Sequence, residues 1–176
     1  LWYLSILSLL LWFWLIIKNY KPKKIFTETF KFGFGYFSIS LIWIVEPFLV
    51  EPWIHGWIAP IALIALPSFL ALTWAIFAFL GHYYLAYIGL VIGLSLAEYW
   101  RLYLLTGFPW ATISYVLLDT KAEKWLSLLG PYGLSLFLFL TCFSIALSLQ
   151  IRKKINVLLA ICTSCTLFFV PYFFKK

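Results

Sequence analysis

Two ionisable residues inside an apolar stretch have the types and spacing best suited to chemistry. Glu98 and Arg101 are three residues apart, so on a helix their side chains share a face and can pair. Gly89, Gly93 and Ala97 precede Arg101 at intervals of four, and small residues at that spacing allow close helix packing in lipid. Charges at membrane depth are costly, which makes the pair a functional candidate. An ion pair that merely locks this helix to a neighbour explains the pattern equally well.

The segment just after this pair has the composition of a turn at a membrane surface. It reads Thr106-Gly107-Phe108-Pro109-Trp110. Glycine permits unusual backbone angles, proline stops a helix, and aromatic rings suit the interface. We interpret it either as an interfacial turn or as the lining of a lipid or peptide site, on the same side of the membrane as Glu98.

Other reactive residue types form no recognisable catalytic set. Cys142, Cys162 and Cys165 all lie within apolar runs, which predicts inert buried thiols. The C-x-x-C spacing of the last two lacks a second pair or a nearby His. No Ser/His/Asp or Cys/His arrangement is visible. We therefore predict no catalytic residues, no metal and no cofactor in this chain.

Composition identifies the class of protein that must position these residues. The 176 residues are 65% hydrophobic and 11% charged, with a mean hydropathy of +1.01. A soluble domain of this size cannot bury so much apolar surface, whereas a bilayer removes the difficulty. The net charge of +7 comes from short clusters between apolar runs rather than from one basic face, so we expect no nucleic-acid partner.

The apolar runs predict an all-α, polytopic membrane helix bundle with about six transmembrane helices and no soluble domain. A span needs roughly 20 residues. The predicted spans are about 1–17, 32–50, 57–80, 84–104, 131–149 and 155–174.

Charges between the spans predict the orientation. The segment 18–31 holds five Lys and one Glu, and the turn at 152–154 is wholly basic, whereas 51–56 has no Lys or Arg. Because basic loops lie on the cytoplasmic side, six crossings place both termini outside. The absence of a basic segment before the first apolar run argues against a signal peptide, and we expect the chain to begin inside a longer protein.

The segment from Ala97 to Trp110, A-E-Y-W-R-L-Y-L-L-T-G-F-P-W, resembles the signature of bacterial apolipoprotein N-acyltransferases. The family pattern is close to A-E-aromatic-x-R-G-x-x-x-T-G-F-P-W, and Leu102 replaces its usual Gly. Two weaker matches flank it in the right order: Gly33-Phe34-Gly35-Tyr36-Phe37 with Trp43, and Tyr132-Gly133-Leu134-Ser135. The resemblance covers almost the whole chain. The first flanking match opens a membrane helix, where we expect its glycines to aid packing.

The resemblance implies an activity for the parent protein. Such enzymes move a fatty acyl chain from a membrane phospholipid to the N-terminal lipid-modified Cys of an apolipoprotein. The acyl group passes through a thioester on a Cys of a nitrilase-like domain, which follows the span that matches 155–174. This chain stops at Lys176, where that domain should begin, so we expect it to be inactive alone.

Three hypotheses stay open from the sequence. The leading one is the membrane part of an apolipoprotein N-acyltransferase, truncated or separately encoded, with a nitrilase-like domain as partner. In it, Glu98, Arg101 and the 106–110 segment help to shape a lipid or substrate site. The others are a small transporter or channel gated by the ion pair, and a non-functional remnant. Internal repeats, which many transporters show, are not visible here.

Overall fold

The part of the chain that can be described is mostly helical. The computed structural model describes residues 2–18, 22–104 and 107–173, and those residues include no strand. In chain order the elements are α1 (Trp2–Lys18), α2 (Pro22–Ser40), the 3-10 helix η1 (Ile42–Leu49), α3 (Pro52–His55), α4 (Ile58–Trp100), η2 (Ile113–Leu117), η3 (Lys121–Lys124), α5 (Trp125–Gln150), α6 (Lys154–Phe168) and η4 (Val170–Phe173). The predicted all-α class is confirmed.

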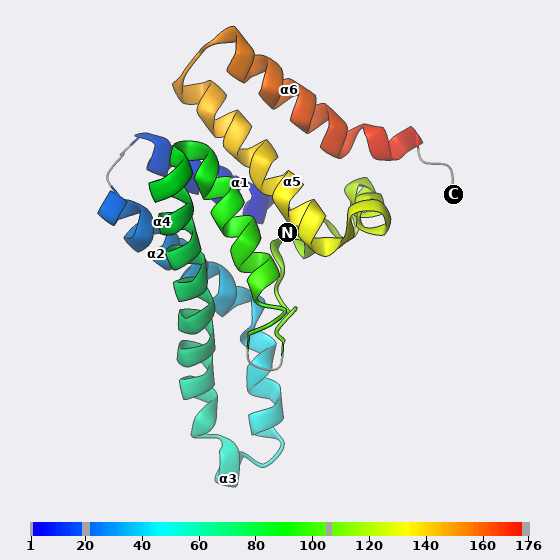
Figure 1. Ribbon diagram of the computed structural model, residues 1–176. Coiled ribbons are helices and arrows are strands. Elements are labelled where there is room, and N and C mark those ends of the chain that lie inside the picture. The colour runs from blue at the N-terminus through cyan, green and yellow to red at the C-terminus, as the bar shows by residue number, and fades with distance from the viewer. Residues whose placement is uncertain (1, 19–21, 105–106, 174–176) are drawn as a thin grey trace.

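Helix α4, 43 residues long, is a hairpin of two helical limbs joined at a sharp kink. The backbone leaves helical geometry at Leu85 and at Ala86, where φ is 52° and ψ is −139°. Figure 1 shows the helix rising from α3, reversing and descending beside itself. We call residues 58–84 the first limb and 87–100 the second limb.

The limbs of α4 meet backbone to backbone through glycine. A Cβ on Gly89 would overlap the carbonyl oxygen of Gly81, and a Cβ on Gly93 would overlap that of Phe77. The predicted spans 57–80 and 84–104 put the reversal between residues 80 and 84, but the structure has it at Leu85–Ala86. Gly81 serves the close approach of the two limbs, so the chain turns only after that contact is complete.

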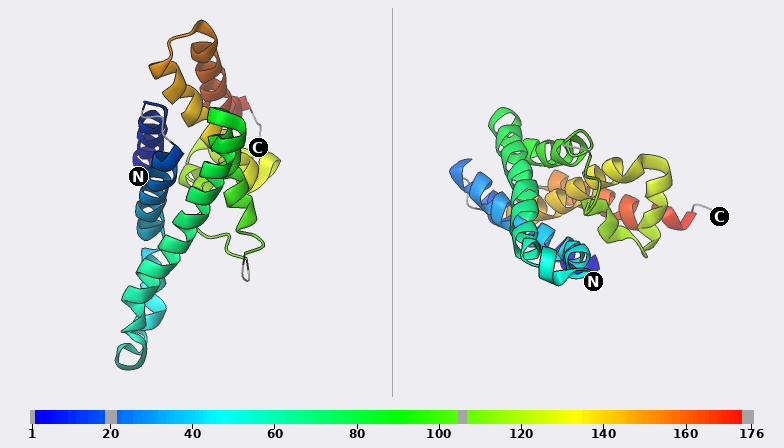
Figure 2. Two further views of the ribbon diagram at one scale, coloured as in Figure 1. Left: turned by 60° about the vertical axis from the view of Figure 1, so that its left-hand side comes forward. Right: turned by 90° about the horizontal axis from the view of Figure 1, so that it is seen from below.

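The bundle is organised around α4 and α5. Helix α2 packs against α4, whereas α1 and α6 both pack against α5, and α5 in turn contacts α4. Figure 2 shows α5 and α6 lying side by side and the first limb of α4 extending well beyond them towards α3. One continuous core joins these elements, with Phe13, Trp74 and Phe139 among its largest fully buried side chains.

Among the described residues, two helices have the length and composition of a membrane span, or three if a bent pair counts as one. Ile58–Trp100 and Lys121–Gln150 are long and apolar enough alone, and the bent pair Lys23–Ser40 and Ile42–Leu49 makes a third if it is one span. Tyr3–Lys18 and Lys154–Phe168 are apolar but shorter. The number of six crossings therefore stays a prediction.

Some expected boundaries and burials differ from the structure. Helix α2 begins at Pro22 rather than near 32, so much of the basic segment is helical. Helix α5 begins at Trp125 and tolerates a break at Gly130, where φ is 65°, although the span was expected from 131. Cys142 is buried as predicted, but Cys162 and Cys165 are exposed on α6, so the prediction that all three thiols are buried was wrong for two of them.

Candidate functional site

Glu98 and Arg101 form an ion pair that is almost completely enclosed by the protein. Arg101 Nη2 lies 2.8 Å from Glu98 Oε1, and the two side chains are 1% and 0% exposed. Arg101 directly follows the end of the second limb, one turn beyond Glu98. The pair therefore lies at the end of the hairpin that is far from the reversal at Leu85–Ala86.

Glu98 has two further donors from other parts of the chain. The indole Nε1 of Trp74, on the first limb, donates to Oε1 at 2.9 Å. The backbone N–H of Ile113, at the start of η2, donates to Oε2 at 3.2 Å. Both carboxylate oxygens are thus satisfied, which is the condition under which a buried charge is tolerated.

Arg101 connects the pair to α2 and to the loop that follows it. Its Nη1 donates to the carbonyl oxygen of Trp110 over 3.4 Å. Its guanidinium carbon lies 5.2 Å from the ring centroid of Phe37, a cation–π distance. Its backbone carbonyl accepts a hydrogen bond from the N–H of Phe108 at 2.9 Å. We call Glu98, Arg101, Trp74 and the backbone groups of Trp110 and Ile113 the Glu98 centre.

Aromatic rings surround the indole of Trp74 and help to enclose the Glu98 centre. Tyr36 stacks on it with ring centroids 5.5 Å apart and an interplanar angle of 14°. Phe37 and Phe139 meet it edge-on at 4.8 and 6.0 Å. Low polarity around a charge pair strengthens the pair's hydrogen bonds and raises the cost of leaving one partner alone.

The loop between α4 and η2 is held in an unusual backbone shape. Gly107 and Ala111 have positive φ values of 82° and 55°. A Cβ on Gly107 would lie 2.9 Å from the carbonyl oxygen of Leu102, which favours glycine at that position. The Tyr36 hydroxyl donates to the carbonyl oxygen of Ala111 at 3.3 Å. A strained alanine persists only where its surroundings over-determine the backbone, as the Glu98 centre does here.

The structure distributes the predicted site residues unequally. Glu98 and Arg101 come together in the interior, whereas Pro109 and Trp110 are exposed, Trp110 by 55%. Gly107 and Phe108 are half-buried, and Thr106 lies outside the described residues. Among the described residues of the predicted site, Pro109 and Trp110 are the exposed ones, so the geometry favours the structural interpretation of the ion pair.

The small residues on the same face pack as a stripe within the hairpin. Gly89, Gly93 and Ala97 are all buried, and the two glycines touch the backbone of the first limb. Their contribution is to bring Trp74 within reach of Glu98, because bulkier residues would hold the limbs apart.

Sequence reasoning missed the partners that come from far along the chain. Trp74 is 24 residues before Glu98 and Ile113 is 15 residues after it. A signal existed for Trp74, since membrane tryptophans favour the interfaces and this one falls inside a predicted span. No signal marked the backbone amide of Ile113.

Comparison with known proteins supplies the family. The sequence-family model for the apolipoprotein N-acyltransferase N-terminal domain matches residues 1–144 of this chain. This chain belongs to that family. The match includes α1 to α4, the Glu98 centre and most of α5.

Individual apolipoprotein N-acyltransferases are similar over most of the same region. The protein from Rhodopseudomonas palustris is 37% identical over 111 residues, covering 60% of this chain and 21% of the relative. Those from Brucella suis and Caulobacter vibrioides are 34% and 33% identical over 117 and 122 residues, covering 61% and 64% of this chain and 22% of each relative. The chain thus matches about a fifth of the length of the curated relatives.

Proposed function

We propose that this chain is the membrane part of an apolipoprotein N-acyltransferase in a bacterial inner membrane. The complete enzyme would transfer a fatty acyl chain from a phospholipid to the N-terminal lipid-modified Cys of an apolipoprotein. The observation that carries the proposal is the family match over residues 1–144, within which Glu98 and Arg101 of the Ala97–Trp110 motif form a buried ion pair.

The chain's own contribution is to hold lipid and to present a rigid surface. The Glu98 centre fixes the loop from Gly107 to Ile113 through three backbone contacts. Pro109 and Trp110 form the exposed end of that loop. We assign to this end the contact with acyl chains or with a nitrilase-like domain that carries the thioester chemistry. Trp110 packs edge-on against Trp43 with centroids 5.8 Å apart, so this surface is aromatic and suited to an interface.

The proposed topology gives the loop a definite side. Six crossings with the basic segments in the cytoplasm would put the Glu98 centre and Trp110 near the outer leaflet. An enzyme that modifies exported lipoproteins needs its lipid-binding surface on that side. Single cysteines introduced at Trp53 and at Lys153, in a cysteine-free background, would label from opposite sides of intact membranes.

Restoring lipoprotein N-acylation tests the function. The chain is expressed together with a nitrilase-like domain in bacteria depleted of their own enzyme, and the N-terminal peptide of a lipoprotein is weighed by mass spectrometry. We expect the triacylated peptide only when both parts are present. A stable complex of the two that yields only diacylated peptide would contradict the proposal.

Two variants locate the contribution of the loop. Trp110→Ala removes the exposed ring and leaves the buried ion pair in place, so we expect a folded protein with reduced N-acylation. Trp53→Ala is the matched control, since Trp53 is 97% exposed and lies on α3, outside the loop. Equal loss of product in both variants would show that the effect is general membrane anchoring rather than the proposed surface.

A further inference from the structure

The seam between α1 and α2 contains a long groove that the protein leaves unfilled. It has a volume of about 480 Å³ and lies between the first two turns of α1 and the last three turns of α2. Its lining residues are Leu4, Ser5, Ser8, Lys31, Phe32, Gly35, Tyr36, Ile39 and Ser40. Leu4 and Ile39 are 51% and 78% exposed, so the groove opens outward, where a membrane protein meets lipid.

The position of Gly35 indicates that another molecule occupies the groove. A glycine inside a helix costs about 1 kcal/mol relative to alanine, so its presence calls for a reason. Gly33, two residues earlier, has one: its Cβ would lie 3.2 Å from Ala71. A Cβ on Gly35 would meet nothing within 4 Å, and the position lines the groove. The absent side chain therefore makes room for something other than this protein.

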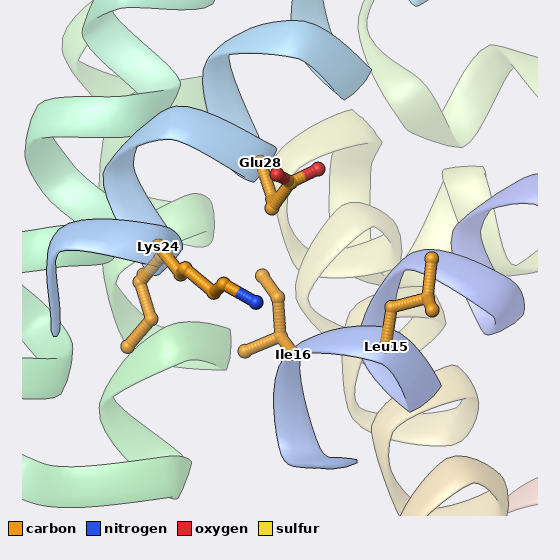
Figure 3. Close-up of a pocket in the computed structure, with 5 residues that line it drawn as sticks. Leu15, Ile16, Lys24 and Glu28 are labelled. Atoms are coloured by element: carbon orange, nitrogen blue, oxygen red, sulfur yellow. The ribbon is translucent and has the colours of Figure 1, made fainter. Parts of the chain in front are cut away.

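Polarity changes along the seam in one direction. A second cavity, of about 230 Å³, lies nearer the α1–α2 connection and is lined by Leu15, Ile16, Lys24, Ile25 and Glu28. Figure 3 shows the Lys24 ammonium group directed into this cavity, with the Glu28 carboxylate above it and Leu15 and Ile16 opposite on α1. The seam is thus charged near the connection and apolar towards Ser40.

The charged end of the seam attracts anions. Lys31 lines the groove and its Nζ lies 3.1 Å from Glu28 Oε1, with the Lys31 side chain 64% exposed. Lys24 lies one turn before Glu28 on the same side of α2, so two lysines flank one glutamate and leave one positive charge. A phosphate group at Lys31 would complement that excess.

The groove also has the length of one leaflet. Ser40 is nine positions after Lys31, which corresponds to a rise of about 13.5 Å along a helix. Half of the hydrocarbon core of a bilayer is about 15 Å. An acyl chain that starts at a head group near Lys31 would therefore end close to Ser40.

From these observations we infer that the α1–α2 groove binds one phospholipid, with its phosphate at Lys31 and one acyl chain lying against Gly35. This lipid is distinct from the acyl donor of the proposed function. Its head group lies at the basic end of the seam, whereas the contact assigned to the proposed function is the exposed end of the loop at Pro109 and Trp110. The bound chain would complete the packing of α1 on α2 and shield Tyr36, which also stacks on Trp74.

Native mass spectrometry of the whole chain tests the site. The protein is reconstituted with phosphatidylglycerol, extracted in a mild detergent and weighed with its retained lipid. We expect one tightly held phosphatidylglycerol on the wild type and its loss in Gly35→Leu, which fills the groove. Ala65→Leu, at an exposed position on the first limb, is the matched control and should keep the lipid. Retention by Gly35→Leu, or equal loss in both variants, would overturn the inference.

The charge at Lys31 gives a second, independent readout. Lys31→Gln removes one positive charge near a membrane surface and should weaken phosphatidylglycerol retention about five-fold. Lys153→Gln, an exposed lysine on the α5–α6 connection, should leave it unchanged. Unaltered retention in Lys31→Gln would overturn the assigned head-group position. A dimer mass in place of a lipid adduct on the wild type would show that a second copy fills the groove, and would overturn the lipid assignment.

N-acylation separates this inference from the proposed function. Gly35→Leu that loses its lipid yet still supports N-acylation with the nitrilase-like domain would uphold both the lipid site and its independence from the acyl donor. A folded Gly35→Leu variant that keeps its phosphatidylglycerol but no longer supports N-acylation would contradict the inference. The proposed function of the wild-type chain would not be affected by that result.

Discussion

Two faces of α2 differ in how far the protein itself fills them. Towards α4, Gly33 touches Ala71 and Phe37 meets the ring of Trp74, so backbone and rings interlock. Towards α1, Gly35 has no neighbour within 4 Å and faces the groove. The same helix therefore has one face closed by the protein and one face left for lipid. In a membrane protein, a helix face can be incomplete without being unstable, because acyl chains can occupy the space.

Breaking the Glu98 centre should have the largest effect on the closed side. Glu98→Gln leaves Arg101 buried without its counter-charge, and removing one partner of a buried pair costs about 3–5 kcal/mol. Denaturant unfolding in detergent micelles measures the loss. The double variant Glu98→Leu/Arg101→Met should recover most of it, because neither charge is then left alone.

The matched control for that pair is the exposed one on α2. Glu28→Gln breaks an ion pair whose side chains are 40% and 64% exposed, and should cost less than about 1 kcal/mol. Similar losses in Glu98→Gln and Glu28→Gln would mean that the Glu98 centre is not enclosed as described.

The contact between the α4 limbs should be next in size. Gly89→Ala places a methyl group on the carbonyl oxygen of Gly81, and overpacking of this kind costs about 1–3 kcal/mol. We expect a lower thermal midpoint, together with quenching changes at Trp74 as its hydrogen bond to Glu98 lengthens. An unchanged midpoint would contradict the backbone contact that defines the hairpin.

The two glycines of α2 compare the face towards α4 with the face towards α1 most directly. Gly35→Ala meets open space and should stabilise the helix by up to about 1 kcal/mol. Gly33→Ala must displace Ala71 or Trp74 and should gain nothing or destabilise by about 1 kcal/mol. Unfolding midpoints of the two variants measured side by side decide this, and equal shifts would remove the distinction between the faces.

The smallest expected effect is on stability at the charged end of the seam. Lys31→Gln should change the unfolding free energy by less than about 1 kcal/mol, because the Lys31–Glu28 pair is exposed. Added salt should shrink the difference further. A loss comparable to that of Glu98→Gln would show that Lys31 is tied into the core.

The spacing of residues along the sequence predicted the pair of Glu98 and Arg101, but not the partners that come from distant parts of the chain. Glu98 and Arg101 could be paired from sequence because three residues on a helix fix their separation. Trp74 could not be assigned to them, because that contact depends on where α4 reverses. Gly81 was taken as part of the turn, whereas the structure uses it for limb contact. A glycine supports both roles, and only the packing partner distinguishes them.

The helical class was predictable, while helix ends and the number of crossings were not. Composition alone required a membrane environment, and the described part of the structure is mostly helical, with no strand. The lysines at 23 and 24 suggested a loop, but they lie on α2, since lysine is a good helix former and a charge does not end a helix. Gly33 and Gly35 were both expected to aid helix packing, although only Gly33 meets a neighbour.

Hydrogen exchange at the loop tests most directly whether the Glu98 centre fixes the surface we assign to acyl transfer. In the wild type the amide of Ile113, bound to Glu98 Oε2 at 3.2 Å, should exchange slowly, as should that of Phe108. In Glu98→Gln both amides should lose protection, while α5 and α6 stay protected and Glu28→Gln behaves as the wild type. Unchanged protection of Ile113 and Phe108 in a folded Glu98→Gln would contradict the account.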